Sequence, residues 1–235
     1  IDNLNPLVDS TAPGAGVHAV TALVTDVHGS QQVEINVAFD EVMDTSVAAR
    51  PTLTLTDDAR VSDTLSLDTG KGGWNTAGTV YTAVYDVTDA AVEIANVTVG
   101  VSGAKDVAGN LMAAYTAEVE FDVDTLNPSV STVSVSDVNA LFTDADVGTA
   151  TITVKFSEDM IDNGTANPTL AFDKDVSGTL SFSSGAWADA QTYVATYAVA
   201  DGDQEVPSVK VTVSGAKDAA GNAMQPHSTA EVEFS

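Results

Sequence analysis

Two nine-residue stretches of the chain are nearly identical and carry the same polar side chains. Residues 102–110 read SGAKDVAGN and residues 214–222 read SGAKDAAGN. Each holds an aspartate, Asp106 or Asp218, followed two residues later by Ala-Gly-Asn. A carboxylate can ligate a hard cation. The same pattern also suits a tight turn, because glycine allows positive φ and asparagine bonds the local backbone. From this stretch alone, the aspartate could be a cation ligand, or the stretch could simply form a tight turn.

Two further acidic segments recur. FDEVMD in the first half of the chain corresponds to FSEDM in the second, and the opening IDNLNP corresponds to VDTLNP. Their candidate ligands are Asp2, Glu41, Asp124, Glu158 and Asp159. The segments differ, since Asp40 corresponds to Ser157 and Val42 to Asp159. Two cation sites built from them could therefore differ in affinity or in ion count.

The whole chain can be superposed on itself in this way, so it contains two copies of one unit. INVAFDEVM corresponds to ITVKFSEDM, YTAVYDV to YVATYAV, and AEVEF occurs twice. Repeats of this length are the size of domains and too long for a solenoid. The sequence predicts one domain over residues 1–122 and a second over 123–235.

Alternation of apolar and polar residues predicts strands. Ile35, Val37 and Phe39 alternate with polar residues, and Val119 and Phe121 close the first repeat in the same way. A period of two indicates half-buried strands, and Gly, Asp, Asn and Pro separate them. We expect an all-β fold: two tandem immunoglobulin-like antiparallel sandwiches, each a Greek key of about seven strands, joined by a short linker. Trp74 and Trp187 are interpreted as core or edge packing.

The expected topology places the acidic residues at the ends of the sandwiches. Alternate loops of such a sandwich lie at alternate ends, so the second–third loop, the sixth–seventh loop and the entering segment should meet. This predicts one acidic group in each repeat. Asp89 and Asp122 would lie at the opposite end of the first repeat, toward the joint with the second.

Crowded carboxylates repel one another unless a cation neutralises them. Calcium takes six to eight oxygen ligands at ~2.3–2.6 Å and fits such a site best, whereas magnesium retains more water. Zinc prefers His or Cys, and the chain has 3 histidines and no cysteine. The alternative is that these acids are solvated surface charge and turn caps.

Charge excludes several partners. The net charge is -26, with 18 acids and 4 bases in residues 1–122 and 16 acids and 4 bases in residues 123–235. Such a surface repels phosphates and anionic membranes, so we expect no nucleic acid and no membrane insertion. We expect a monomer whose partners include neighbouring repeats of the same chain. The start, IDNLNP, lacks an initiator Met and a signal peptide, so we expect a fragment of a longer protein.

These motifs resemble those of the bacterial immunoglobulin-like repeats of very large cell-surface adhesins, including RTX-type, type I-secreted adhesins. The resemblance rests on V/I-D-x-x-x-P, F-S-E-D-M and D-x-A-G-N, and it covers both repeats. It implies a secreted, cell-surface extender module, stiffened by calcium at its joints, that projects a distal ligand-binding region for attachment or biofilm formation. It assigns calcium ligands at Asp2, Glu41, Asp106, Asp124, Glu158 and Asp218.

Other functions remain as alternatives. The chain could bind a host or surface glycan or protein directly, or be an accessory domain of a secreted enzyme or a surface-layer protein. We expect no enzymatic activity, because the sequence has no G-x-S-x-G, H-E-x-x-H, phosphate loop or Cys-His pair. We also expect no aromatic-lined cleft beside the acidic loops to hold a sugar for glycosidase chemistry.

Overall fold

A computed structural model describes residues 8–28, 32–56, 58–136, 142–143, 147–229 and 234. The chain divides into two compact units, Ile1–Leu126 and Asn127–Ser235. The first unit thus ends four residues beyond the predicted boundary at residue 122. The reason is that strand β9 (Tyr115–Asp124) continues across that boundary, and Val123 is buried in the core of the first unit.

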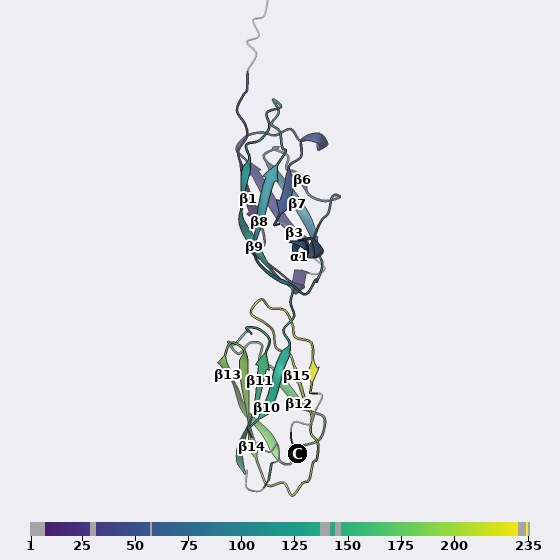
Figure 1. The fold of residues 1–235 in the computed structure, drawn as a ribbon, viewed down its shortest axis with the longest axis vertical. Helices are drawn as coiled ribbons and strands as arrows, with labels where there is room; N and C mark the ends of the chain where they lie inside the picture. The colour runs from purple at the N-terminus through teal and green to yellow at the C-terminus, as the bar shows by residue number, and fades with distance from the viewer. Residues whose placement is uncertain are drawn as a thin grey trace, which may run out of the picture. The chain divides into compact units, whose positions relative to one another are not determined.

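In the first unit, two sheets form a sandwich (Figure 1). One sheet has the order β1-β3-β7-β5, with β6 also paired to β7, and the other has the order β2-β9-β8-β4. The remaining strands of this unit are β1 (Ala15–Ala19), β2 (Leu23–Thr25), β3 (Gln32–Phe39), β4 (Thr52–Leu55), β5 (Leu65–Leu67), β6 (Gly73–Trp74), β7 (Val80–Val87) and β8 (Glu93–Ser102). All pairs are antiparallel except β2 with β9, which is parallel.

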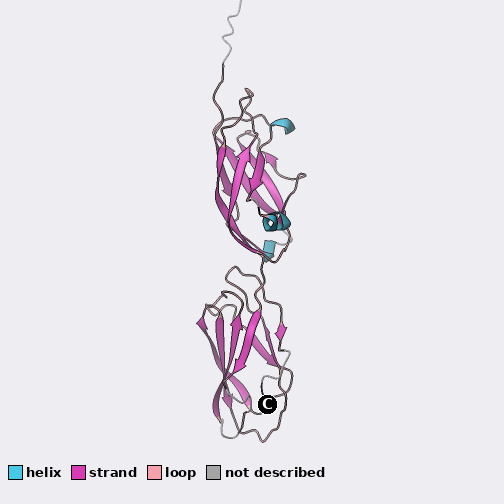
Figure 2. Cartoon of the chain, viewed as in Figure 1, coloured by secondary structure: helices cyan, strands magenta, loops and turns pink. Residues whose placement is uncertain are grey.

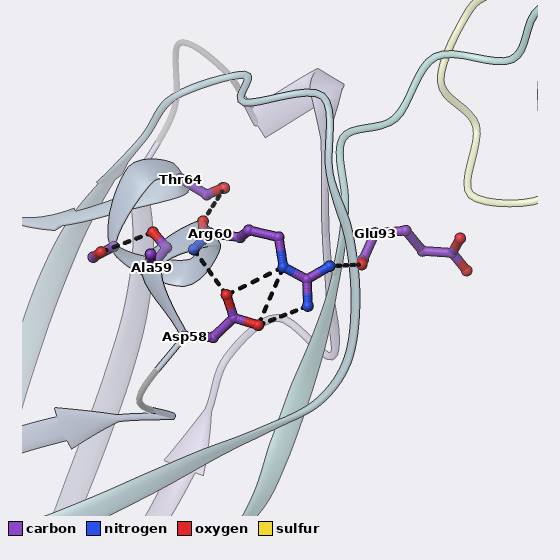
Figure 3. A network of polar contacts seen from close by, with 6 residues as sticks. Asp58, Ala59, Arg60, Thr64 and Glu93 are labelled. Carbon is purple, nitrogen blue, oxygen red and sulfur yellow. Dashed lines mark hydrogen bonds and ion pairs between the residues drawn. The ribbon is translucent and has the colours of Figure 1, made fainter.

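Helices are short in the described part of the chain (Figure 2). They are η1 (Asp26–His28), η2 (Val47–Ala49) and α1 (Ala59–Thr64). Asp58 caps α1 by accepting a hydrogen bond from the Arg60 backbone N–H, and the Arg60 guanidinium also reaches the Glu93 carbonyl on β8 (Figure 3). None of these helices is long and apolar enough to cross a membrane.

The second unit has two sheets of order β10-β11-β14-β13 and β12-β15-β16. Its strands are β10 (Val130–Val135), β11 (Gly148–Phe156), β12 (Thr169–Phe172), β13 (Leu180–Asp189), β14 (Thr192–Val199), β15 (Val211–Ser214) and β16 (His227–Ser228). In chain order, one sheet holds strands one, two, five and four, and the other holds three, six and seven. This is the strand distribution of the immunoglobulin fold.

The predicted tandem immunoglobulin-like sandwiches are confirmed. In the first unit the same distribution holds for β1, β3, β7 and β5 in one sheet and for β4, β8 and β9 in the other. Its departures from the expected seven antiparallel strands are the short strands β2 and β6 and the parallel β2–β9 pair.

Alternation predicted the core of each unit well, with one error. Ile35 and Val37 of β3 are fully buried, as are Ile152 and Val154 of β11. Val119 was expected to share the core face with Phe121, but it is 56% exposed. The pairing of β8 with β9 shifts register between Val97 and Thr98, and this β-bulge interrupts the alternation of faces.

Both tryptophans pack as expected. The centroid of the Trp74 ring lies 5.4 Å from that of Phe39 and 5.3 Å from that of Tyr81. Trp187 lies 5.6 Å from Phe156 and 5.2 Å from Tyr193. The two indole N–H groups differ in their hydrogen bonding. Trp187 Nε1 donates to Asn167 Oδ1 at 2.9 Å, whereas buried Trp74 Nε1 has no hydrogen-bond partner among the described residues.

Candidate metal centre

The SGAKDVAGN stretch forms the loop between β8 and β9 and is closed by its own aspartate. Asp106 is 1% exposed. Its Oδ1 accepts the Asn110 backbone N–H at 2.8 Å, and its Oδ2 accepts Asn110 Nδ2 at 2.7 Å. Gly109 has a φ of 92°, where a side chain would be strained. The turn interpretation of this motif is therefore correct for the loop itself.

The corresponding loop after β15 repeats this geometry. Asp218 is 1% exposed, and its Oδ1 accepts the backbone N–H groups of Gly221 and Asn222 at 2.7 and 2.8 Å. Its Oδ2 accepts Asn222 Nδ2 at 2.9 Å. Both aspartates thus hold their loops in one conformation.

The two predicted loops do meet in each unit. In the first, the Asp44 N–H donates to the Lys105 carbonyl at 2.9 Å, and Met43 bridges to Asp106. In the second, the Ile161 N–H donates to the Lys217 carbonyl at 2.9 Å, and Met160 bridges to Asp218. Backbone pairing therefore fixes the loop that carries Glu41 or Glu158 against the loop that carries the buried aspartate.

Three carboxylates converge at this end of the first unit. Ligand oxygens of Asp9, Glu41 and Asp106 all lie within 4.8 Å of one another. Asp9 is exposed, Glu41 is half-buried and Asp106 is buried. In the second unit, ligand oxygens of Glu158 and Asp218 likewise lie within 4.8 Å of each other, while Asp124 is the last residue of β9 in the first unit. Glu41 with Asp106, and Glu158 with Asp218, are brought together as the sequence predicts.

Burial and neighbouring charge shift the pKa values of Glu41 and Asp106 in opposite directions. Burial raises the pKa of Glu41 above 4.5, and the charges of Asp9, Asp106 and Asp40 raise it further. Burial acts in the same direction on Asp106, but hydrogen bonds from Asn110, Ala108 and Gly109 outweigh it and lower the pKa of Asp106 below 3.8. The charged form of Asp106 is therefore favoured by its hydrogen bonds. The charged form of Glu41 is disfavoured by burial and by its acidic neighbours.

Asp9 is a site residue that sequence comparison missed. Asp2 was expected in this position, and it lies outside the described residues. Because Asp2 corresponds to Asp124 at an offset of 122, Asp9 corresponds to Ser131, and the repeat pattern gives no signal for it. One feature of the sequence did point to Asp9. It lies in the segment that enters the first repeat, and that segment was expected to reach this end of the sandwich.

Three other candidates lie outside the two described groups. Asp89 Oδ1 accepts the Ala91 N–H at 2.9 Å, and Asp122 Oδ1 accepts the Asn96 N–H at 2.7 Å. Asp159 Oδ1 accepts Gln191 Nε2 at 2.9 Å. These hydrogen bonds orient each carboxylate toward a local donor, and neither described group includes any of the three.

Asp40 and Ser157, which differ between the repeats, have the same structural role. Asp40 Oδ1 accepts the Gly14 N–H at 2.8 Å, and Ser157 Oγ accepts the Ser129 N–H at 3.0 Å. Each side chain fixes the entering segment beside the loop. The exchange changes the charge next to the acidic group while retaining this contact.

Comparison with known proteins gives structural likeness without a family. No family model and no curated protein matches the sequence. Among solved structures, the chain is similar to FdeC, described as a broadly conserved Escherichia coli adhesin eliciting protection against urinary tract infections. The TM-score is 0.47 at 12% identity, over 94% of this chain and 64% of that one. The chain thus spans less than two thirds of that structure.

A second similar structure is the D00-D0 domain of intimin, with a TM-score of 0.40 at 14% identity, over 94% of this chain and 99% of that one. Both TM-scores lie below 0.5, so neither likeness assigns a function or a family. The order of the strands in each unit is what identifies the chain as a pair of immunoglobulin-like β-sandwiches.

Proposed function

We propose that this chain is a pair of extender modules of a secreted bacterial surface adhesin, with calcium bound by the acidic group of each repeat. The observation that carries the proposal is the grouping of three carboxylates, one of them buried, within 4.8 Å in the first unit, together with the matching approach of Glu158 to Asp218 in the second. Like charges at this separation disfavour the folded state unless a cation neutralises them. The extender role, secretion by a type I route and a place at the cell surface rest on the resemblance in sequence motifs.

The residues fit a calcium ion better than other metals. All side chains of the two groups offer carboxylate oxygen, the ligand that calcium prefers, and none offers the nitrogen or sulfur typical of zinc sites. Asp106 and Asp218 are held by hydrogen bonds before any ion binds. Asp9, Glu41 and Glu158 supply the remaining charge of the two groups.

The proposed mechanism is electrostatic. Without calcium, repulsion within each group loosens the entering segment relative to the loops. With calcium, the carboxylates are bridged, and the segment that leads into each repeat is fixed against its sandwich. Asp124 belongs to the segment that leads into the second repeat, so an ion held there would stiffen the joint between neighbouring repeats.

Calcium is expected to raise the melting temperature of the chain. At a calcium concentration of about 100 times Kd, one site that exists only in the folded state adds about 2.7 kcal/mol to the free energy of unfolding. Thermal melts in EDTA, in calcium and in magnesium measure this, and Glu41→Gln should remove most of the calcium response of the first unit. Glu34→Gln is the matched control, because Glu34 is exposed on β3 of the same unit and lies outside both groups.

Calcium binding at this group would be contradicted by equal melting temperatures in EDTA and in calcium. It would also be contradicted if calcium raised the melting temperature equally in Glu41→Gln and Glu34→Gln. Stiffening is tested separately by X-ray scattering of the intact chain, which should have a narrower range of maximum dimensions in calcium. Asp124→Ala should abolish that narrowing while both units remain folded.

The calcium response should also depend on pH. A proton on Glu41 competes with calcium, and the pKa of Glu41 is raised above 4.5 by burial and by its acidic neighbours. The calcium-induced rise in melting temperature should therefore be complete near neutral pH and decline as the pH falls through this raised pKa. Melts in calcium and in EDTA across this range give the response as a difference.

Without calcium, protonation of Glu41 has the opposite effect and stabilises the folded state. The folded state holds its proton more tightly than the unfolded state, so its contribution to stability is present below pH 4.5 and is lost as the pH rises through the raised pKa. Asp106, with its lowered pKa, contributes stability above pH 3.8 that is lost as the pH falls. A calcium response that is unchanged by acidification would contradict the role of Glu41.

A further inference from the structure

The second unit contains a cavity that the calcium proposal does not use. It has a volume of about 680 Å³ and lies between the two sheets, along the side formed by β12 and β13. Four aromatic side chains line it, namely Phe172, Phe182, Tyr193 and Tyr197. The volume is within the range of ligand pockets, roughly 300–1,000 Å³. Sequence reasoning did not anticipate an aromatic-lined cavity here.

The connection beside the cavity differs between the two repeats. In the first unit, residues 56–64 join β4 to β5, and they include helix α1 (Figure 3). The side chain of Val61 in this helix is buried. In the second unit, only residues 173–179 join β12 to β13, two residues fewer, and no helix forms there. Val176 of this connection is buried, as Val61 is, and it lines the cavity together with Lys174, Asp175 and Ser177.

Aromatic residues have replaced aliphatic ones at this cavity. Phe172 stands where the first repeat has Leu55, and Phe182 stands where it has Leu67. Phe182 is 61% exposed, and the edge-on contact with Tyr197 at 5.7 Å orients its ring. Tyr197 makes a similar contact with Phe172 at 5.6 Å. The cavity thus presents an oriented, exposed aromatic ring, which contributes little to the core of the unit.

The polar groups of the lining suit a neutral ligand. Asn167, Thr169 and Ser177 supply amide and hydroxyl groups. The two charged side chains have opposite signs and are held by neighbouring groups, since Lys174 Nζ donates to the Pro207 carbonyl and Asp175 Oδ1 accepts from Ser177. The net charge of -26 opposes anionic ligands.

We propose that this cavity binds a neutral oligosaccharide. The apolar C–H face of a pyranose ring packs on an exposed aromatic ring such as Phe182, while its hydroxyls exchange hydrogen bonds with amide and hydroxyl groups such as those of Asn167 and Thr169. Such a combination of aromatic surface and a few oriented polar groups is characteristic of small-molecule sites. This binding activity is independent of calcium at the acidic loops.

The chain carries its own reporter for this test. Trp187 Nε1 donates to Asn167, which lines the cavity, and the Trp187 ring contacts Tyr193. Trp74 lies in the first unit and serves as an internal reference. Titration of the intact, nitrogen-labelled chain with maltose, cellobiose and lactose should give a saturable shift of the Trp187 indole N–H signal for at least one sugar. The Trp74 signal should not move.

Variants locate the binding site. Phe182→Ala and Phe182→Leu should each weaken the affinity about tenfold or more, because both remove the aromatic ring. Leu67→Ala, at the corresponding exposed position of the first repeat, should leave it unchanged. The proposal is overturned if no neutral disaccharide gives a saturable shift up to about 20 mM. It is also overturned if choline or sialic acid binds in their place, or if both Phe182 variants bind as the parent chain does.

Discussion

Replacing Asp218 with alanine is expected to lower the free energy of unfolding of the second unit by about 2–4 kcal/mol in the absence of any calcium. The substitution removes the acceptor of three hydrogen bonds, from the backbone N–H groups of Gly221 and Asn222 and from Asn222 Nδ2. Asn222 is fully buried, so its two donors gain no water in exchange. Urea or thermal unfolding of the second unit in EDTA measures the loss.

The same variant separates the two roles of this aspartate. In calcium, Asp218→Ala should also lose the stabilisation that the ion gives to the second repeat, so its deficit should be larger than in EDTA. Asp162→Ala, an exposed acid in the same unit, should change stability by no more than about 0.5 kcal/mol in either condition. A deficit that appears only in calcium would mean that the aspartate does not hold the loop.

Replacing Phe156 with alanine is expected to cost about 3–5 kcal/mol and to lower the melting temperature of the second unit by roughly 10 °C or more. Phe156 is 1% exposed and packs against Trp187 in the core of that unit. The core residues of the first unit form separate clusters. The melting temperature of the first unit should therefore be unchanged.

Phe182→Ala is the matched control, because it removes the same side chain from an exposed position of the same unit. Its effect on stability should be within about 0.5–1 kcal/mol. Calorimetry of the intact chain resolves the outcome as one displaced and one unchanged transition. A shift of both transitions in Phe156→Ala would show that the units unfold together.

The strands were predictable because burial on one face of a sheet imposes a period of two on the sequence. Ile35, Val37 and Phe39 obey it, and all are buried. Val119 obeys it in sequence and is exposed in the structure. A β-bulge shifts one strand against its partner, and this depends on pairing between residues far apart in the chain. Local alternation does not contain that information.

The acidic groups were predictable to the extent that topology decides them. Alternate loops of a sandwich lie at alternate ends, so Glu41 was expected near Asp106 and Glu158 near Asp218. Which other acid completes the first group was not predictable. Asp9 joins the first group, while Asp159 is directed toward Gln191. Such choices depend on the path of the entering segment and on distances of a few ångströms.

The sequence by itself determined the two repeats, the strand-rich architecture and the loops on which the acids gather, because repetition, hydrophobic period and turn residues are local properties of the chain. Only the tertiary structure decided that Asp106 and Asp218 are buried caps of their own loops as well as members of the acidic groups. It also decided that an aromatic-lined cavity lies between the two sheets of the second unit. Both depend on how the edges and loops of two packed sheets close against each other, which no single segment specifies.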